Sequence, residues 1–230
     1  AVSLDDSLGR VLARDIRSEI NVPGFDNSAM DGYTIALNDN QVAQENLSFD
    51  VVDRIAAGST GNDLKMGSAA RIFTGAPIPN GANTVIMQEE CTLSMDKSHI
   101  TVKRAINLNE NIRPTGNDIL IDNVILSTGR QIKPQDISLA ASVGIGDLVV
   151  FKKIKVGVFF TGDELVEPGK PLTPGKIYNS NRYALVALLK QVGCDVINLG
   201  NIEDKLDATC DALETLESQC DLIMTTGGVS

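Results

Sequence analysis

Tryptophan is absent from this 230-residue chain, histidine occurs once, and aromatic residues make up only 4%. A core built from this composition has to be mainly aliphatic. The four cysteines contain no C-x-x-C pair, and one histidine cannot complete a zinc site with them. The chain is also long for a small disulfide-rich secreted domain, so we expect reduced, buried thiols.

Acidic residues outnumber basic ones, and the formal net charge is −10. This excess argues against binding to nucleic acid or to an acidic membrane surface, both of which require basic patches. No apolar run approaches the roughly 18 residues of a membrane span, and no signal peptide opens the sequence. We therefore expect a cytoplasmic protein with no membrane or nucleic-acid partner.

Two segments show the spacing or punctuation of helices. Leucine, valine and isoleucine recur at helical spacing between residues 4 and 16, and Ser3 is a candidate N-cap, so we expect a helix there. A second helix is expected after Lys133, with Pro134 in its first turn and Gly144 at its C-cap. Residues 1–20 and 122–150 are assigned to a discontinuous linking domain with helices.

A β-rich domain is expected at residues 21–121. There, short apolar stretches alternate with Gly, Pro and Asn, which is typical of strands joined by turns. The expected strands are 49–55, 69–75, 83–88 and 99–104.

The last part of the chain, residues 151–230, has the order strand, helix, strand, helix, strand. The strands are expected at 153–160, at 194–200 and from residue 220, and the helices at 179–193 and 204–218. This order predicts an open parallel α/β sheet. Three strands rarely complete such a sheet, so we expect a truncated α/β domain in a fragment of a longer protein. The predicted fold class is α/β plus mainly-β, in a multi-domain chain.

Small, hydroxyl and acidic residues follow the three expected strands of this domain. The segments are TGDEL (161–165), LGNIED (199–204) and TTGGVS (225–230). Ligands of open α/β sheets bind beyond the carboxyl ends of the strands, where glycine N–H groups approach phosphate and carboxylates hold Mg²⁺. We therefore predict a site for a phosphate-bearing ligand with a divalent cation. Each segment alone also fits a simpler role, as a glycine turn, a solvated acidic loop or, for Asp204, a helix N-cap.

Two segments of the β-rich domain have a similar character. Thr74 and Gly75 end an expected strand, and the two prolines that follow indicate a rigid corner. Arg113 and Asp118 lie on either side of Gly116. The arginine is suited to hold an anion bidentately or to form a surface ion pair.

Five segments occur in one order along the chain. They are PGFDNSAMDGY, TGAPIP followed by VIMQEE, NIRPTGNDI, TGDELVEPG followed by GKIYNSN, and TTGGVS. In this combination the chain closely resembles the bacterial molybdopterin molybdenumtransferases, the MoeA family, which is related to the E domain of gephyrin. The resemblance covers essentially the whole chain. It implies an elongated protein whose α/β domain is a MogA-like, molybdopterin-binding domain.

The resemblance implies an enzyme of molybdenum-cofactor biosynthesis. Such an enzyme inserts molybdate into adenylylated molybdopterin, with Mg²⁺ and with release of AMP. The family forms a homodimer whose active site is shared between the β-rich domain of one subunit and the α/β domain of the other, and other proteins of the cofactor pathway are candidate partners. The loop from Pro23 to Tyr33 would then present Asp31 to a ligand on the partner subunit.

Functional residues follow from the resemblance, position by position. The implied catalytic residues are Asp31, Thr74, Asp118, Glu164 and Asp204, of which Glu164 and Asp204 are also the implied metal ligands. The implied cofactor-binding residues are Thr161, Gly162, Asp163, Gly227, Gly228 and Ser230. Two positions depart from the family pattern, because Asn117 stands where an acid is common and Phe160 where serine is usual. We expect the fragment to have impaired activity or none.

Two other functions compete with this interpretation. One is a non-catalytic scaffold or binding protein of the gephyrin type, and the other is a generic Mg²⁺-dependent phosphoesterase. The acids and the hydroxyl in five loops favour an enzyme, since a scaffold does not need them. A phosphoesterase would act on ATP or sugar phosphates without any dithiolene ligand.

Overall fold

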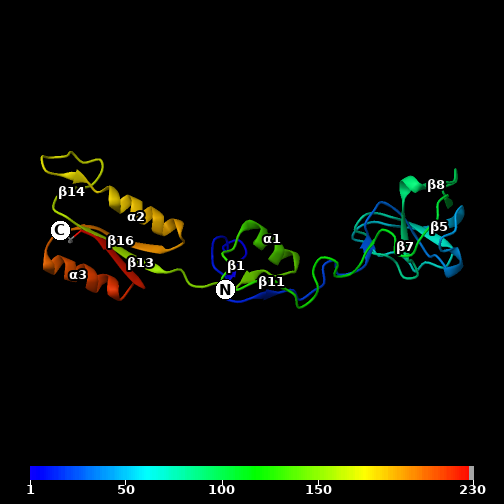
Figure 1. Ribbon diagram of the computed structural model, residues 1–230, viewed down its shortest axis with the longest axis horizontal. Coiled ribbons are helices and arrows are strands. Elements are labelled where there is room, and N and C mark those ends of the chain that lie inside the picture. Colours follow the sequence, from blue (N-terminus) through cyan, green and yellow to red (C-terminus); the bar gives the residue numbers. More distant parts are fainter. Residues whose placement is uncertain (228–230) are drawn as a thin grey trace. The chain divides into compact units, whose positions relative to one another are not determined.

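The computed structural model describes residues 1–227, which fall into two compact units (Figure 1). The first unit consists of Ala1–Arg14, Thr128–Ile137 and the chain from Gly146 onward, and the second of Asp15–Ser127 and Ser138–Ile145. None of the helices in residues 1–227 has both the length and the apolar character that a membrane crossing requires. The assignment of three domains to 1–20 with 122–150, 21–121 and 151–230 stays a prediction.

Most regular elements of the second unit are strands. They are β2 (Ile16–Arg17), β3 (Asn27–Ser28), β4 (Gly32–Ile35), β5 (Leu47–Ile55), β6 (Ser68–Ile72), β7 (Thr84–Met87), β8 (Cys91–Leu93), β9 (His99–Val102), β10 (Ile112–Arg113) and β11 (Val124–Leu126). Two single-turn helices, η1 (Asp39–Gln41) and η2 (Gln88–Glu90), lie between them. The four expected strands are confirmed as β5, β6, β7 and β9. In addition, β3 and the first two residues of β4 lie in the segment Pro23–Tyr33, which the sequence predicted to be a loop.

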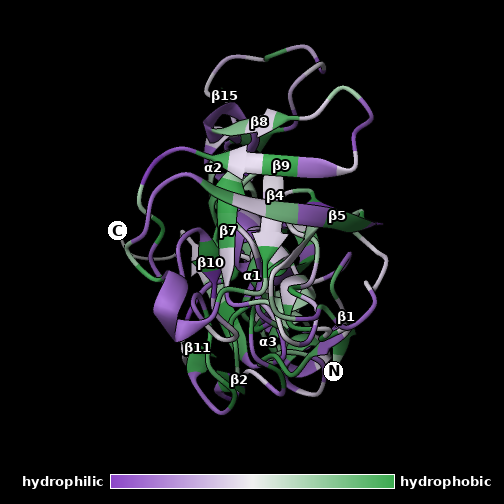
Figure 2. Ribbon diagram, turned by 90° about the vertical axis from the view of Figure 1, so that its right-hand side faces the viewer, coloured by the Kyte–Doolittle hydropathy of each residue, from purple (hydrophilic) through white to green (hydrophobic). Residues whose placement is uncertain are grey.

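Six of these strands form one mixed sheet in the order β7-β4-β6-β5-β9-β8. Only β5 and β6 run parallel. Hydrophobic and hydrophilic residues follow each other along β5 (Figure 2), and Phe49 and Ile55 are buried there. Isoleucine, valine and leucine make up most of the core, as the composition predicted, but three phenylalanines are also fully buried: Phe49, Phe159 and Phe160.

The helix expected near the N-terminus does not form, and that prediction was wrong. Instead, β1 (Val2–Ser3) pairs antiparallel with β12 (Asp147–Leu148), and Leu12 forms a bridge to Val150. Gly9 has φ +74°, which no right-handed helix accepts. Pairing with residues distant in sequence therefore outweighs the local helical spacing.

The second expected helix is confirmed as α1 (Pro134–Ser142). Asp136 is only 2% exposed and fixes its first turn. Its carboxylate accepts a hydrogen bond from the Lys133 N–H (3.0 Å) and pairs with the Arg130 guanidinium (2.9 Å). The Arg130 guanidinium holds the pKa of Asp136 below its usual value. Gly144, at φ +83°, follows the end of the helix, as the sequence predicted.

The remaining elements belong to the first unit. They are β13 (Lys155–Thr161), β14 (Leu165–Val166), β15 (Ile177–Tyr178), α2 (Ser180–Gln191), β16 (Asp195–Ile202), α3 (Leu206–Glu217) and β17 (Leu222–Thr226). Three of the strands form a parallel sheet in the order β16-β13-β17, which confirms the expected open α/β arrangement.

Successive residues of the central strand β13 face opposite helices. Val158 and Phe160 pack toward α2, and Phe159 packs toward α3. The two helices lie on opposite sides of the sheet (Figure 1). Gly157 lies under Leu216 of α3, where an added Cβ would come within 2.7 Å of the leucine side chain. Coverage on both faces explains why β13 is apolar along nearly its whole length.

Candidate functional site

The carboxyl ends of β13, β16 and β17 lie at one edge of the α/β sheet. Thr161 is in register with Ile202, and Phe160 with Thr226. Residues 161–164, 203–204 and 227 therefore lie at this edge, which we call the strand-end edge. The predicted convergence of the three loops is confirmed, while Gly228 and Ser230 lie outside the described residues.

Gly227 is explained by close packing of the backbone. Its φ is +112°, and an added Cβ would lie 2.4 Å from both the carbonyl oxygen and the Oγ1 of Thr161. Thr161 itself is only 8% exposed. At this position the glycine allows two strand ends to meet, which supports the simple structural role rather than approach of a phosphate.

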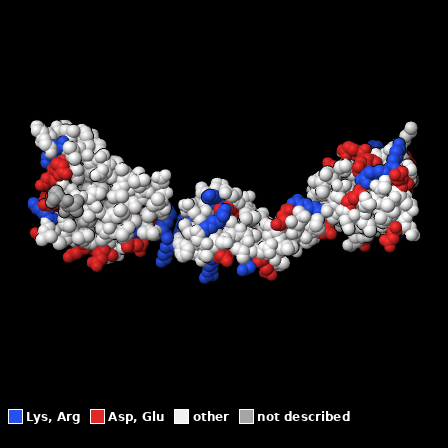
Figure 3. All heavy atoms as spheres, viewed as in Figure 1, with Lys and Arg blue, Asp and Glu red and all other residues white. Residues whose placement is uncertain are grey.

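Acidic side chains dominate the strand-end edge. Asp163, Glu164, Glu203 and Asp204 are all exposed. Lys205 pairs with Glu203 at 2.6 Å, and this contact, aided by Asp163, raises the pKa of Lys205. In Figure 3, acidic and basic side chains lie close together at one end of this unit.

The simpler role weighed for Asp204 does not hold. The residue at the N-cap position of α3 is Lys205, and no side chain caps the helix there. Within residues 1–227, no three His, Cys, Asp or Glu side chains are grouped to hold a metal ion. Metal binding by Glu164 and Asp204 therefore stays a prediction that rests on two carboxylates.

In the other unit, the structure brings Asp31 and Thr74 together although 43 residues separate them. Asp31 Oδ1 accepts hydrogen bonds from the Thr74 N–H (2.8 Å) and hydroxyl (2.9 Å). These two bonds hold the pKa of Asp31 below its usual value. Close by in the sequence, the Ser28 N–H donates a hydrogen bond to the Ala76 carbonyl oxygen at 3.0 Å. Two of the predicted catalytic residues thus form one exposed pair.

A second aspartate of the Pro23–Tyr33 loop, Asp26, makes the same pair of hydrogen bonds with another threonine. Asp26 Oδ1 accepts from the Thr115 N–H (2.7 Å) and hydroxyl (2.8 Å), which lowers the pKa of Asp26. The sequence alone did not indicate a role for Asp26. Because the loop binds one segment through Asp31 and another through Asp26, it joins the TGAP and NIRPTGND motifs.

Asp118 is held by its own segment. It forms an ion pair with Arg113, and its Oδ1 accepts from the Asn117 side-chain amide at 3.0 Å. The pairing with Arg113 lowers the pKa of Asp118. Of the two roles weighed for Arg113, the structure shows the ion pair.

Arg71 lies beside the Asp31–Thr74 pair and was not identified from the sequence. Its guanidinium carbon lies 5.2 Å from the centre of the Tyr33 ring and 4.8 Å from that of Phe73. The same group donates hydrogen bonds to the Gly32 carbonyl (3.0 Å) and to Gln88 (2.5 Å). After the two bonds from the Thr74 N–H and hydroxyl, its charge is a further cause of the low pKa of Asp31. The sequence signal for this arrangement was the spacing of Arg71 and Phe73. They are two residues apart in an expected strand, so their side chains lie on the same face.

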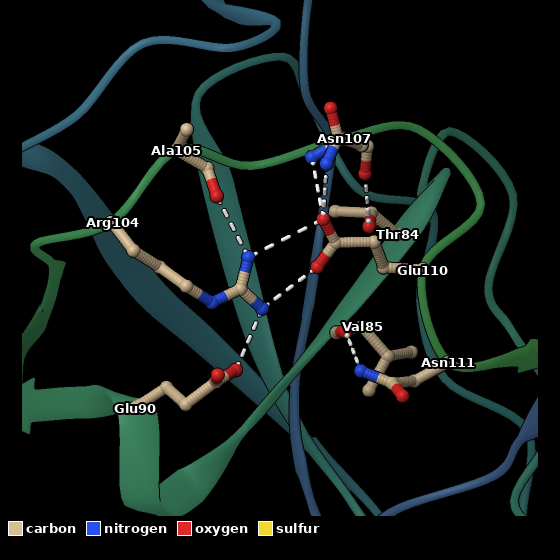
Figure 4. Close-up of polar contacts among 8 residues, drawn as sticks. All are labelled: Thr84, Val85, Glu90, Arg104, Ala105, Asn107, Glu110 and Asn111. Atoms are coloured by element: carbon tan, nitrogen blue, oxygen red, sulfur yellow. Dashed lines mark hydrogen bonds and ion pairs between the residues drawn. The ribbon is translucent and has the colours of Figure 1, made fainter.

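A second arginine of this unit, Arg104, links two acidic side chains (Figure 4). Arg104 donates to Glu90 at 2.6 Å and to Glu110 at 2.7 Å, and both contacts raise the pKa of Arg104. The neighbouring Asn111 donates to the Val85 carbonyl at 2.9 Å. These contacts cover β7 with the segment that leads into the NIRPTGND motif, so their role is structural.

A pocket of ≈ 580 Å³, which could not be predicted from the sequence, lies along β16 and the start of α2. We call it the β16 pocket. Its charged and amide side chains are Glu167, Lys170, Arg182, Asn198 and Asn201. It requires β14, α2 and β16 together, which only the folded chain provides.

Two protein-family models match the chain. "MoeA N-terminal region (domain I and II)" matches residues 1–144, and "Probable molybdopterin binding domain" matches residues 157–230.

The most similar relatives include enzymes from two bacteria. The chain is 44% identical over 230 residues to a molybdopterin molybdenumtransferase of Haemophilus influenzae, covering 100% of this chain and 56% of the relative. It is 38% identical over 234 residues to the protein of the same name from Bacillus subtilis, covering 100% of this chain and 54% of that one. The chain thus spans little more than half the length of these relatives.

Solved structures agree with the sequence comparisons. A crystal structure of a molybdopterin biosynthesis moeA protein from Pyrococcus horikoshii OT3 superposes with a TM-score of 0.89 at 33% identity. The match covers 100% of this chain and 61% of that one.

Proposed function

The chain belongs to the MoeA family of molybdopterin biosynthesis proteins, and from this premise we propose that the protein containing it is a molybdopterin molybdenumtransferase. It takes adenylylated molybdopterin and molybdate, requires Mg²⁺ and releases AMP. It acts as a cytoplasmic homodimer, in which the Asp31 loop of one subunit and the strand-end edge of the other form the active site.

The observation that carries this proposal is the exposed Asp31–Thr74 pair. Oδ1 of Asp31 is held by two bonds from Thr74, whereas Oδ2 accepts no hydrogen bond from the described residues. The carboxylate is therefore fixed, ionised at neutral pH and open to a ligand on one side. A fixed acceptor of this kind orients a substrate N–H or O–H group, or accepts its proton.

Glu164 and Asp204 would hold Mg²⁺ at the strand-end edge. Neither forms an ion pair with a basic side chain in the part of the chain that the structure describes. Carboxylates suit Mg²⁺, which keeps several waters of its own. When bound, the ion would neutralise charge on the phosphate of the departing AMP. Asp118, held by Arg113, has a supporting role on the Asp31 side.

The test is AMP release from adenylylated molybdopterin, measured with and without molybdate and Mg²⁺. It is run on this chain and on the longest natural form of the protein. Asp31→Asn removes the charge while keeping the shape, and we expect at least a roughly hundredfold loss of turnover in the long form. Asp96→Asn is the matched control, because Asp96 is an exposed acid held by Ser94 and Ser98 in a turn of the same unit.

The outcomes separate the candidate functions. A long form that binds molybdopterin but releases no AMP would point to the scaffold function. Release of phosphate from ATP or sugar phosphates, without molybdopterin, would point to a phosphoesterase. Equal loss of turnover in Asp31→Asn and Asp96→Asn would show that Asp31 is not part of the active site.

A further inference from the structure

The β16 pocket has the size of a small-molecule site and no role in the function proposed above. Its volume, ≈ 580 Å³, lies within the roughly 300–1,000 Å³ usual for ligand pockets. Asn201, on its wall, is in register with Phe160, one residue before the end of β13. The pocket is therefore next to the strand-end edge.

The acid in the pocket is already engaged by the protein. Glu167 Oε1 accepts from Arg182 Nη1 at 2.6 Å, and its Oε2 accepts from the Tyr183 hydroxyl at 3.0 Å. Nε and Nη2 of Arg182 have no acceptor among the described residues, so they stay available as donors. The exposed Lys170 forms no ion pair within residues 1–227.

Both amides in the pocket use their oxygens inside the protein. Asn198 Oδ1 accepts from the Gly200 N–H at 2.9 Å. Asn201 Oδ1 accepts from the side-chain amide of Asn179, which is only 2% exposed and also accepts from the Arg182 N–H at the start of α2. The Nδ2 groups of Asn198 and Asn201 are left as donors. Every polar side chain that the pocket still offers is therefore a donor, and two of them are cations.

We propose that the β16 pocket binds the phosphate group of the ligand held by this domain. The proposal rests on the function proposed above and deepens it, because it places the phosphate beside the strand-end edge rather than on it. Two cations and one acid give the pocket a net charge of +1. The strand-end edge carries four acids and one lysine, a net charge of −3, so a phosphate is less favoured on that edge than in the positively charged pocket. Phosphate and divalent cation thus occupy neighbouring but separate places.

The experiment titrates this 230-residue chain with inorganic phosphate and with AMP at constant low ionic strength. Calorimetry gives the affinity, and amide NMR shifts give the location. Lys170→Gln, at an exposed position, is expected to weaken binding about fivefold. Glu167→Gln keeps an acceptor for Arg182 but removes the negative charge, and is expected to tighten binding about threefold. Lys155→Gln, at the opposite end of β13, makes the same change of net charge and is expected to leave the affinity unchanged.

Three results would overturn the proposal. The first is the absence of phosphate-induced shifts at Arg182 and Gly200. The second is the largest shifts at Thr161 and Lys205, which would place the phosphate on the strand-end edge. The third is equal weakening by Lys170→Gln and Lys155→Gln, which would indicate only general attraction.

This test fails separately from the test of the proposed function. If phosphate binds in the pocket but the long form of the protein releases no AMP, the phosphate site is supported and the transferase activity is refuted. Release of AMP together with phosphate that avoids the pocket would remove only the present proposal.

Discussion

Gly32, in the middle of the MDGY motif, should not tolerate even one added methyl group. It lies in β4, between β6 and β7, in register with Met87 of β7. An added Cβ would lie 1.9 Å from the Ile86 carbonyl oxygen and 2.8 Å from its carbon. Both are backbone atoms, so no side-chain rotation relieves the overlap.

The magnitude follows from the movement required. Ordinary contact begins near 3.4 Å, so β4 and β7 would have to separate by about 1.5 Å at this point. Such a separation breaks one or two ladder hydrogen bonds, each worth about 1 kcal/mol, and strains the packing by about 1–3 kcal/mol. We expect Gly32→Ala to lower the free energy of unfolding by about 2–4 kcal/mol. For a unit of this size that corresponds to a fall in Tm of roughly 5–15 °C.

Gly24→Ala is the matched control, because Gly24 lies in the same PGFDNSAMDGY segment as Gly32 but outside β4. An added Cβ at Gly24 would lie 3.7 Å from the Asn21 carbonyl oxygen, which is an ordinary contact. Its expected change is within about 0.5 kcal/mol. Thermal and urea unfolding of both variants provide the comparison. Equal stability of Gly32→Ala and Gly24→Ala would refute the argument that close strand approach fixes this glycine.

Three further predictions concern single side chains. Thr74→Val removes a hydrogen bond to Asp31, so carboxyl NMR should show the pKa of Asp31 rising toward its usual value. In the parent chain the low pKa of Asp31 adds stability above about pH 4, and this is lost as pH falls through the folded-state pKa. Asp136→Asn should lower the free energy of unfolding by about 1 kcal/mol in a urea titration, because the carboxylate is buried and fixes the first turn of α1. Burial raises the pKa of Cys91 to about 11, so a thiol reagent near about pH 8 should label the exposed Cys210 first.

Each of these has its own control. Thr74→Ser keeps the hydroxyl and should keep the pKa of Asp31 low, so identical titrations of the Val and Ser variants would contradict the proposed hydrogen bond. Asp147→Asn changes an exposed acid in β12 and should leave stability nearly unchanged. Equal labelling rates at Cys91 and Cys210 would show that burial does not protect the first thiol.

The spacing of apolar residues correctly predicted those helices and strands in which the apolar residues are the ones that pack against the sheet or core. The apolar run of β13 and the spaced leucines of α2 and α3 led to the correct order of elements in the α/β sheet. The same method failed near the N-terminus. There, the spacing suited a helix, but Gly9 and pairing with β12 and Val150 produced extended chain.

The sequence also placed three loops at one sheet edge, since parallel strands must end on the same side. It did not indicate that Gly227 serves packing against Thr161, or that Lys205 stands at the start of α3. Those outcomes depend on atomic distances between segments far apart in the chain.

By itself, then, the sequence determined the family, most of the regular elements and the convergence of the acidic loops. These follow from local patterns and from motifs in a fixed order. Only the tertiary structure decided the partners across long separations, such as Asp31 with Thr74 and Asp26 with Thr115, 43 and 89 residues apart. It also created the β16 pocket, because a cavity exists only once strands and helix have packed around it. A single sequence carries no distance between such residues, and for that reason these features could be seen only in the fold.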